Sequence, residues 1–177
     1  MVRRASAERA ISPFVERCFD QLAVQRQALI LDMPCGFGRH AIWLAAKGFC
    51  VIAMDIDPKR TAATALLRPR EIRPGSVDCL VADAEADLPY RESIFDVALV
   101  VHYYSDGIVE KMSRYLKPGG HLVFETFGAQ GQNWRSLPIS GATERVLNRG
   151  FEVIYLKELL AGPSKLNAVV RALARKK

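Results

Sequence analysis

Short apolar runs of strand length alternate with stretches of helical periodicity along this chain. A strand buried on both faces of a sheet reads as a continuous apolar run, so these runs predict strands. They lie at residues 28–33, 50–57, 76–82, 95–104, 121–127 and 151–156. Helices are predicted at 11–22, 39–47, 58–67 and 107–116, with a short one ending at Gly150. This alternation is typical of an α/β fold.

The pattern alone does not decide the structure or role of two segments. Residues 127–141 show no periodicity and predict a loop, either a substrate lid or a plain connector carrying Trp134. The last segment, AVVRALARKK, is rich in residues that favour helix, yet its run at 168–173 also has the length of a strand.

The stretch from Ala28 to Gly48 predicts a strand, a glycine loop and a helix in succession. Gly36 and Gly38 allow a sharp turn and a close approach of the backbone to a ligand. Good helix formers follow from Arg39, and Gly48 stands where a left-handed helix stop is expected. The helix therefore begins directly against whatever the loop holds.

Two cofactors compete for this loop. The spacing Gly36-x-Gly38-x-x-Ala41, followed by Asp55, satisfies the dinucleotide fingerprint and permits NAD. Asp32 stands at the end of the strand, where an acid would repel the pyrophosphate of NAD. S-adenosylmethionine carries an ammonium and a sulfonium instead, so Asp32 favours S-adenosylmethionine.

The loop also resembles a known family. LDMPCGFGRHAIWLA is similar to motif I of the class I S-adenosylmethionine-dependent methyltransferases, particularly small bacterial enzymes similar to tellurite-resistance methyltransferases. LKPGGHLVFETF and the pattern from Asp83 to Pro89 resemble the same family. Pro34 departs from it, because many members have Gly or Ala there; proline keeps its carbonyl but lacks the N–H.

The resemblance implies a doubly wound, seven-stranded, mostly parallel sheet with a Rossmann-like methyltransferase fold. Residues 168–173 then form a strand of a C-terminal antiparallel hairpin. Residues 1–177 form a single domain, in which residues 1–27 are an N-terminal helical segment covering the site. The cofactor-binding positions implied are Asp32, Pro34, Gly36, Gly38, Arg39, Asp55, Ile56, Asp83, Ala84 and Val101.

Acids follow the second and third predicted strands. Asp55 is placed to accept two hydrogen bonds from ribose hydroxyls, whereas Asp57 directly precedes Pro58 and is expected to cap a helix. By resemblance, Ile56 lies against the adenine and Asp83 binds the adenine amino group. The alternative for Asp83 is an exposed acid in a turn.

The most continuously apolar run ends in His102, Tyr103 and Tyr104, where a doubly wound sheet presents its ligand crevice. Methyl transfer depends mainly on orientation, so no universal triad is expected. His102 is the candidate general base, or else a buried histidine with a structural role. Tyr103 and Tyr104 are candidates to orient the acceptor or face the sulfonium.

Composition limits the remaining classes. No apolar stretch is long enough to span a membrane and no signal peptide is evident, which predicts a cytoplasmic protein. The four cysteines and three histidines lack metal-ligand spacing, so no metal is expected. The net charge of +6 gathers at the chain ends without interleaved aromatics. The prediction is a methyltransferase with a small-molecule acceptor; an RNA methyltransferase and a non-catalytic scaffold are the alternatives, and the oligomeric state stays open.

Overall fold

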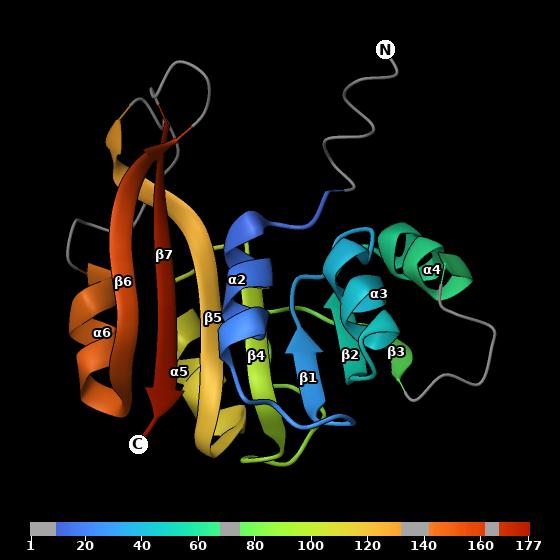
Figure 1. Ribbon diagram of the computed structural model, residues 1–177. Helices are drawn as coiled ribbons and strands as arrows, with labels where there is room; N and C mark the ends of the chain where they lie inside the picture. Colours follow the sequence, from blue (N-terminus) through green and yellow to red (C-terminus); the bar gives the residue numbers. More distant parts are fainter. Residues whose placement is uncertain (1–9, 68–74, 132–141, 162–166) are drawn as a thin grey trace. The chain divides into compact units, whose positions relative to one another are not determined.

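The computed structural model describes residues 10–67, 75–131, 142–161 and 167–177. The chain forms two compact units, one ending at Leu88 and the other beginning at Pro89, each built of alternating strands and helices (Figure 1). Across these described ranges, no helix is both long and apolar enough to cross a membrane.

The first unit is a parallel sheet of order β3-β2-β1. Helix α3 contacts β2, and α4 contacts β2 and β3. The elements are α2 (Pro13–Gln21), β1 (Leu29–Asp32), α3 (Arg39–Ala46), β2 (Cys50–Asp55), α4 (Pro58–Leu67) and β3 (Ser76–Val81). Leu29 pairs with Cys50 and Cys50 with Ser76, so the three strands begin level with one another. At the carboxyl ends Asp55 pairs with Val81, whereas β1 ends two residues earlier, where Asp32 pairs with Ala53.

The second unit is a mixed sheet of order β4-β5-β7-β6, with α5 and α6 packed together and against β5 and β6. Strands β4 and β5 are parallel, whereas β7 pairs antiparallel with both β5 and β6. The elements are β4 (Phe95–Val101), α5 (Ile108–Tyr115), β5 (Leu116–Gly131), α6 (Ala142–Gly150), β6 (Phe151–Ala161) and β7 (Asn167–Lys176).

Each unit has its own apolar core, formed by the runs that predicted strands. Fully buried side chains of the first unit include Ile30, Leu31 and Met54 on its strands and Leu44 on α3. Those of the second unit include Phe95, Leu99, Ile108, Met112, Leu122 and Phe124. Burial of this apolar surface is the main favourable term that holds each sheet to its helices.

Strand β5 is longer than its apolar run. It pairs with Phe95 already at Leu116, then with Val97 at His121, so the Pro-Gly-Gly segment between them bulges from the strand. Helix α5 ends at Tyr115, one residue before the predicted end, because Leu116 already pairs with Phe95 as part of the strand. Residues 127–131, expected to open a loop, belong to β5, and residues 132–141 lie outside the described residues.

The C-terminal segment is a strand, which confirms the hairpin expected from the resemblance. β7 lies between β5 and β6 and pairs along its length with both. Ten residues gain two ladders of backbone hydrogen bonds there, and this tertiary pairing outweighs the helix propensity of Ala, Leu, Arg and Lys.

Candidate functional site

The glycine loop of the first unit connects the end of β1 to the start of α3. Gly36 and Gly38 both adopt left-handed backbone, with φ of +57° and +73°. Gly38 is the N-cap of α3, and the loop is closed by the Gly38 N–H donating to the Cys35 carbonyl at 3.0 Å. Met33 and Pro34 precede it, joined by a cis peptide bond.

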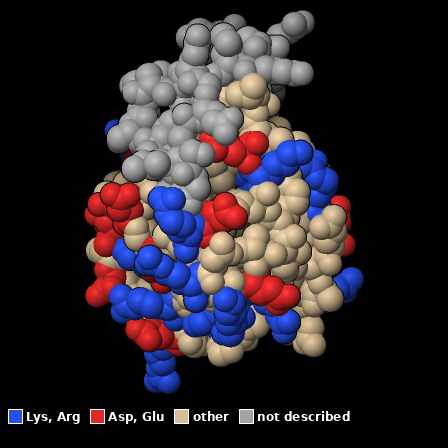
Figure 2. Space-filling model, turned by 90° about the vertical axis from the view of Figure 1, so that its left-hand side faces the viewer, with Lys and Arg blue, Asp and Glu red and all other residues tan. Residues whose placement is uncertain are grey.

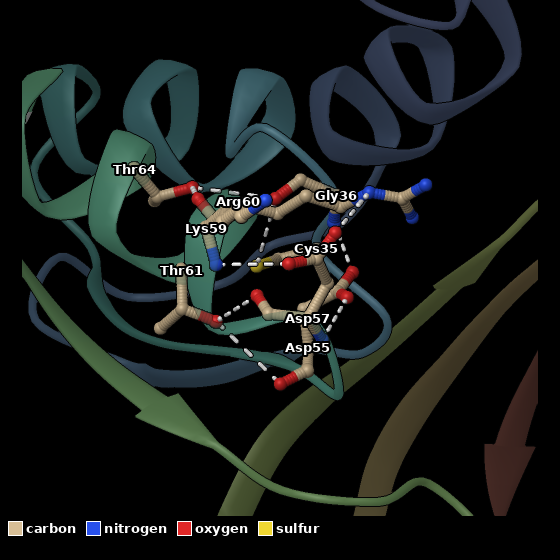
Figure 3. Close-up of polar contacts among 8 residues, drawn as sticks. All are labelled: Cys35, Gly36, Asp55, Asp57, Lys59, Arg60, Thr61 and Thr64. Carbon is tan, nitrogen blue, oxygen red and sulfur yellow. Dashed lines mark hydrogen bonds and ion pairs between the residues drawn. The ribbon is translucent and has the colours of Figure 1, made fainter.

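Asp55, at the end of β2, holds this loop through its carboxylate. Oδ2 accepts the Gly36 N–H at 2.8 Å, and Oδ1 accepts the Asp57 N–H at 2.9 Å (Figure 3). Asp55 is buried. Each carboxylate oxygen has two lone pairs, so both retain capacity to accept further hydrogen bonds such as those of a ribose.

Asp57 caps α4, as the sequence predicts. Its Oδ1 accepts the Lys59 N–H at 2.8 Å, with Pro58 at the first helical position. The same carboxylate lies 3.5 Å from Arg60, an exposed pair of little energetic weight. The two acids at the end of β2 therefore have different roles: Asp55 binds the glycine loop and Asp57 caps the start of α4.

Asp32 is a buried carboxylate that receives no hydrogen bond of normal geometry from the described residues. Its side chain is 1% exposed, and neither oxygen has a hydrogen-bond partner among the described residues. Burial raises the pKa of Asp32 to about 7. The dipole of the nearby Ala41 backbone N–H, which is not placed for a hydrogen bond of normal geometry, and the charge of Arg39 oppose this rise. A buried acid at a glycine loop marks a place where a bound cation would be stabilised.

Exposed apolar side chains accompany these acids. Ile56, directly after β2, is 63% exposed, and Phe37 of the loop and Val81 at the end of β3 are also exposed. The Arg60 guanidinium lies 5.8 Å from the centre of the Phe37 ring. Large exposed apolar groups at the ends of strands are available to cover an apolar part of a ligand.

Asp83 and Ala84 follow β3. Asp83 is exposed, and its Oδ1 accepts the Glu85 N–H at 2.8 Å, so the acid stabilises its own turn. Ala84 is buried. The hydrogen bond from Glu85 occupies one lone pair of Asp83. The role of Asp83 in binding adenine stays a prediction.

The leading segment contacts the two residues that open α3. The Arg39 guanidinium donates to the Ala10 carbonyl at 3.1 Å, and the Ser12 N–H donates to Nε2 of buried His40 at 3.2 Å. Phe19 of α2 meets Trp43 edge to face, with 6.0 Å between ring centres. These contacts give buried His40 a structural role.

In the second unit, β4 ends at Val101 and His102 follows it. Val101 is buried; His102 is exposed and adopts φ of +57°, uncommon for a residue with a side chain. Its N–H donates to the Glu125 carbonyl at 2.7 Å, and its ring stacks on Phe127 at 6.0 Å between centres. Strained backbone at the carboxyl end of a parallel strand is typical of functional positions.

Tyr103 and Tyr104 are half-buried. The Tyr104 hydroxyl donates to Oδ1 of Asp106 at 3.1 Å, and burial together with this acceptor raises the pKa of Tyr104. Tyr104 is therefore a neutral hydrogen-bonding group at neutral pH, which suits an orienting role better than proton transfer.

A buried ion pair beside His102 was not anticipated from the sequence. Glu125 of β5 is 4% exposed at its side chain, and its Oε1 lies 2.8 Å from Nε of Arg171, directly opposite on β7. An acid within the apolar run LVFETF is the sequence signal that could have indicated this pair. Because Arg171 neutralises Glu125, this pair leaves little net charge at the end of β5.

The chain is similar in sequence to a known protein family and to individual methyltransferases. The sequence pattern of the family described as Methyltransferase domain matches residues 31–124. Methyltransferase GfsG of Streptomyces halstedii is 30% identical over 124 residues, 66% of this chain and 44% of that protein. The tRNA U34 carboxymethyltransferase of Cellvibrio japonicus is 32% identical over 125 residues, 66% of this chain and 38% of that protein.

Solved structures show the same fold. A methyltransferase from Methanosarcina mazei superposes with a TM-score of 0.67 at 20% identity, over 94% of this chain and 98% of that one. The seven-stranded Rossmann-like fold is thereby confirmed. The chain spans about half the length of the curated relatives it matches first.

Because the family pattern covers more than half of its residues, the chain belongs to the class I S-adenosylmethionine-dependent methyltransferase family. S-adenosylmethionine is the cofactor, as Asp32 indicated against NAD. The narrower resemblance to tellurite-resistance methyltransferases stays a prediction. In the described part of the chain, no group of three or more His, Cys, Asp or Glu side chains is arranged to hold a metal ion.

Proposed function

We propose that this chain catalyses transfer of a methyl group from S-adenosylmethionine to a small-molecule acceptor. The observation that carries the proposal is Asp32, a fully buried carboxylate with no hydrogen-bond partner among the described residues, beside the glycine loop. A cofactor with an ammonium and a sulfonium supplies the positive charge that such a carboxylate lacks.

The other residues of the first unit fit the same cofactor. Asp55 keeps acceptor capacity for ribose hydroxyls, exposed Ile56 is available to the adenine face, and Gly36 faces open space, with no atom within 4 Å of a built Cβ. Bound there, S-adenosylmethionine supplies an activated methyl group. The residues of this chain bind and orient it, and orientation alone accounts for about 7–11 kcal/mol of a barrier.

The ends of β4 and β5 support a small acceptor with a planar ring. His102 and Phe127 form a stacked, exposed pair, with half-buried Tyr103 and Tyr104 following on the chain. The nearby cation Arg171 forms an ion pair with Glu125. An aromatic surface with little net charge favours a flat, uncharged molecule over a metalloid oxyanion.

RNA is the competing acceptor, suggested by the charge of +6 and by the relatives named for tRNA. Figure 2 shows Lys and Arg side chains interspersed with Asp and Glu on one face. A surface of mixed sign attracts phosphates weakly.

Two assays test the proposal. Calorimetric titration with S-adenosylmethionine and, in parallel, NAD is expected to show micromolar binding of the former alone. Labelled methyl groups from S-adenosylmethionine are then offered to a low-molecular-mass cell fraction and to total RNA. Transfer to the small molecules supports the proposal, and transfer to RNA that weakens steeply with salt overturns the acceptor class.

His102→Ala is expected to lower the rate of methyl transfer at least about 100-fold while cofactor affinity stays within twofold, because a positioned general base contributes about 10²–10⁴ in rate. Steady-state kinetics and calorimetry measure the two quantities. His121→Ala, which removes another histidine of the same unit, is the matched control. Equal effects of the two substitutions would exclude His102 as the base.

Cofactor binding is expected to release close to one proton at pH 6 and almost none at pH 8.5. The pKa of Asp32 is about 7 in the free fold, against 3.8 ordinarily, and a bound ammonium lowers it. The raised pKa also means that Asp32 destabilises the free protein progressively as pH rises from about 4 to about 7. Calorimetric titration in buffers of different ionisation enthalpy measures the number of protons released. If Asp32→Asn released the same number, the proton would come from a group other than Asp32.

A further inference from the structure

The buried face of α4 is polar, although a helix that covers a sheet normally buries an apolar stripe. Its buried side chains are Thr61 and Thr64, whereas Leu66 and Leu67 at its end are exposed. The core therefore does not explain why these two positions are hydroxyl-bearing. The contacts of each threonine do.

Thr64 contacts three residues of the glycine loop. Its hydroxyl lies 3.4 Å from the Gly36 carbonyl and 3.0 Å from the Arg60 carbonyl in its own helix (Figure 3). The same hydroxyl interacts with the Cys35 thiol, whose pKa is raised by burial. At Gly38 the approach is so close that a built Cβ would lie 2.9 Å from Cβ of Thr64.

Thr61, one turn earlier, directs its hydroxyl to the turn that joins β2 to α4. Its hydroxyl lies 3.5 Å from the Asp55 carbonyl and 3.1 Å from the Asp57 carbonyl. The two threonines share a helix and a chemical type, and both are buried. They differ in that Thr64 reaches the glycine loop and Thr61 does not.

Gly36 is consequently held at both of its backbone polar groups. Asp55 accepts its N–H at 2.8 Å, and the Thr64 hydroxyl, whose single proton is shared with the Arg60 carbonyl, lies against its C=O. The same C=O also accepts a weak hydrogen bond from the Cys35 thiol at 3.6 Å. Glycine has no side chain to restrict its dihedral angles, so these contacts set the orientation of the loop peptide.

We infer that Thr64 is a positioning residue for the cofactor: its hydroxyl orients the Gly36 carbonyl and so fixes the glycine loop in its binding conformation. The inference rests on the proposed binding of S-adenosylmethionine at this loop. A loop that is already ordered spends less binding free energy on ordering when the ligand arrives.

The test separates the hydroxyl of Thr64 from its volume. Thr64→Val keeps the shape and removes the hydroxyl, and is expected to weaken binding of S-adenosylhomocysteine about tenfold by calorimetry. Thr64→Ser keeps the hydroxyl and is expected to bind within threefold of the unsubstituted chain. Thr61→Val, the matched control, removes a buried hydroxyl from the same helix and is also expected to bind within threefold.

The outcomes distinguish this inference from the proposed function. Unchanged affinity in Thr64→Val, with normal binding by the unsubstituted chain, would overturn the role of Thr64 and leave the function intact. Equal losses in Thr64→Ser and Thr64→Val would also overturn it, because packing rather than the hydroxyl would then be responsible. No binding by the unsubstituted chain would instead reject the proposed function itself.

Discussion

Asp55→Ala is expected to lower the affinity for S-adenosylhomocysteine at least about 100-fold and the free energy of unfolding by about 3–6 kcal/mol. The carboxylate accepts the N–H groups of Gly36 at 2.8 Å and Asp57 at 2.9 Å. Hydrogen bonds to charged groups contribute about 1.5–3 kcal/mol each, and removing the acceptor leaves both donors without it. The glycine loop loses its tie to β2 at the same time as the proposed ribose contact.

Calorimetry and urea unfolding measure the two effects. Asp57→Ala is the matched control, since it removes an acid two residues away whose Oδ1 accepts the Lys59 N–H. It is expected to cost about 1 kcal/mol of stability, as for loss of a helix N-cap, with affinity within threefold. Loss of affinity in Asp57→Ala as large as in Asp55→Ala would contradict the assignment of Asp55.

Gly38→Ala is expected to destabilise the fold by about 3 kcal/mol. A left-handed φ of +73° costs a residue with a Cβ about 1–2 kcal/mol, and the added methyl meets the side chain of Thr64, an overpacking that costs about 1–3 kcal/mol. Relief of this clash would move α4 away from the loop, so cofactor affinity is expected to fall as well. Urea unfolding gives the free energy and calorimetry the affinity.

Gly36 and Gly107 provide controls for the backbone term alone. Both have left-handed φ, and a Cβ built at either meets nothing within 4 Å. Gly36→Ala and Gly107→Ala are each expected to cost about 1 kcal/mol of stability. Only Gly36→Ala is expected to weaken cofactor binding, because its methyl would enter the open space proposed for the cofactor. A Gly38→Ala variant as stable as these two would show that the Thr64 side chain moves aside without lowering the free energy of unfolding.

Much of the site could be predicted because its signals are local. The apolar run before the loop, the two glycines and the proline opening α4 each act within a few residues, and β1, α3 and α4 begin within about one residue of their predicted positions. Only one of the roles of Asp55 and Asp57 could be predicted. The helix cap at Asp57 is confirmed. The hydrogen bond from the Gly36 N–H to Asp55 spans 19 residues and could be found only in the folded structure.

Other features depend on contacts that no local pattern encodes. Thr64 reads as an ordinary helical residue until its hydroxyl is seen against Gly36, 28 residues earlier. Arg171 similarly becomes the partner of Glu125 only because β7 pairs with β5. The position of His102 after β4 could be predicted, but its left-handed backbone and its stacking on Phe127 could not.

The sequence by itself determined the α/β alternation, the glycine loop and the acids that favour S-adenosylmethionine, because periodicity, turn chemistry and charge act over short stretches. Tertiary structure decided that the C-terminal segment is a strand and that Asp55 and Thr64 together hold Gly36. It also decided that Asp32 is buried with no hydrogen-bond partner among the described residues. These properties arise only when strands pair and helices pack, since burial and hydrogen-bond geometry belong to neighbours that are distant along the chain.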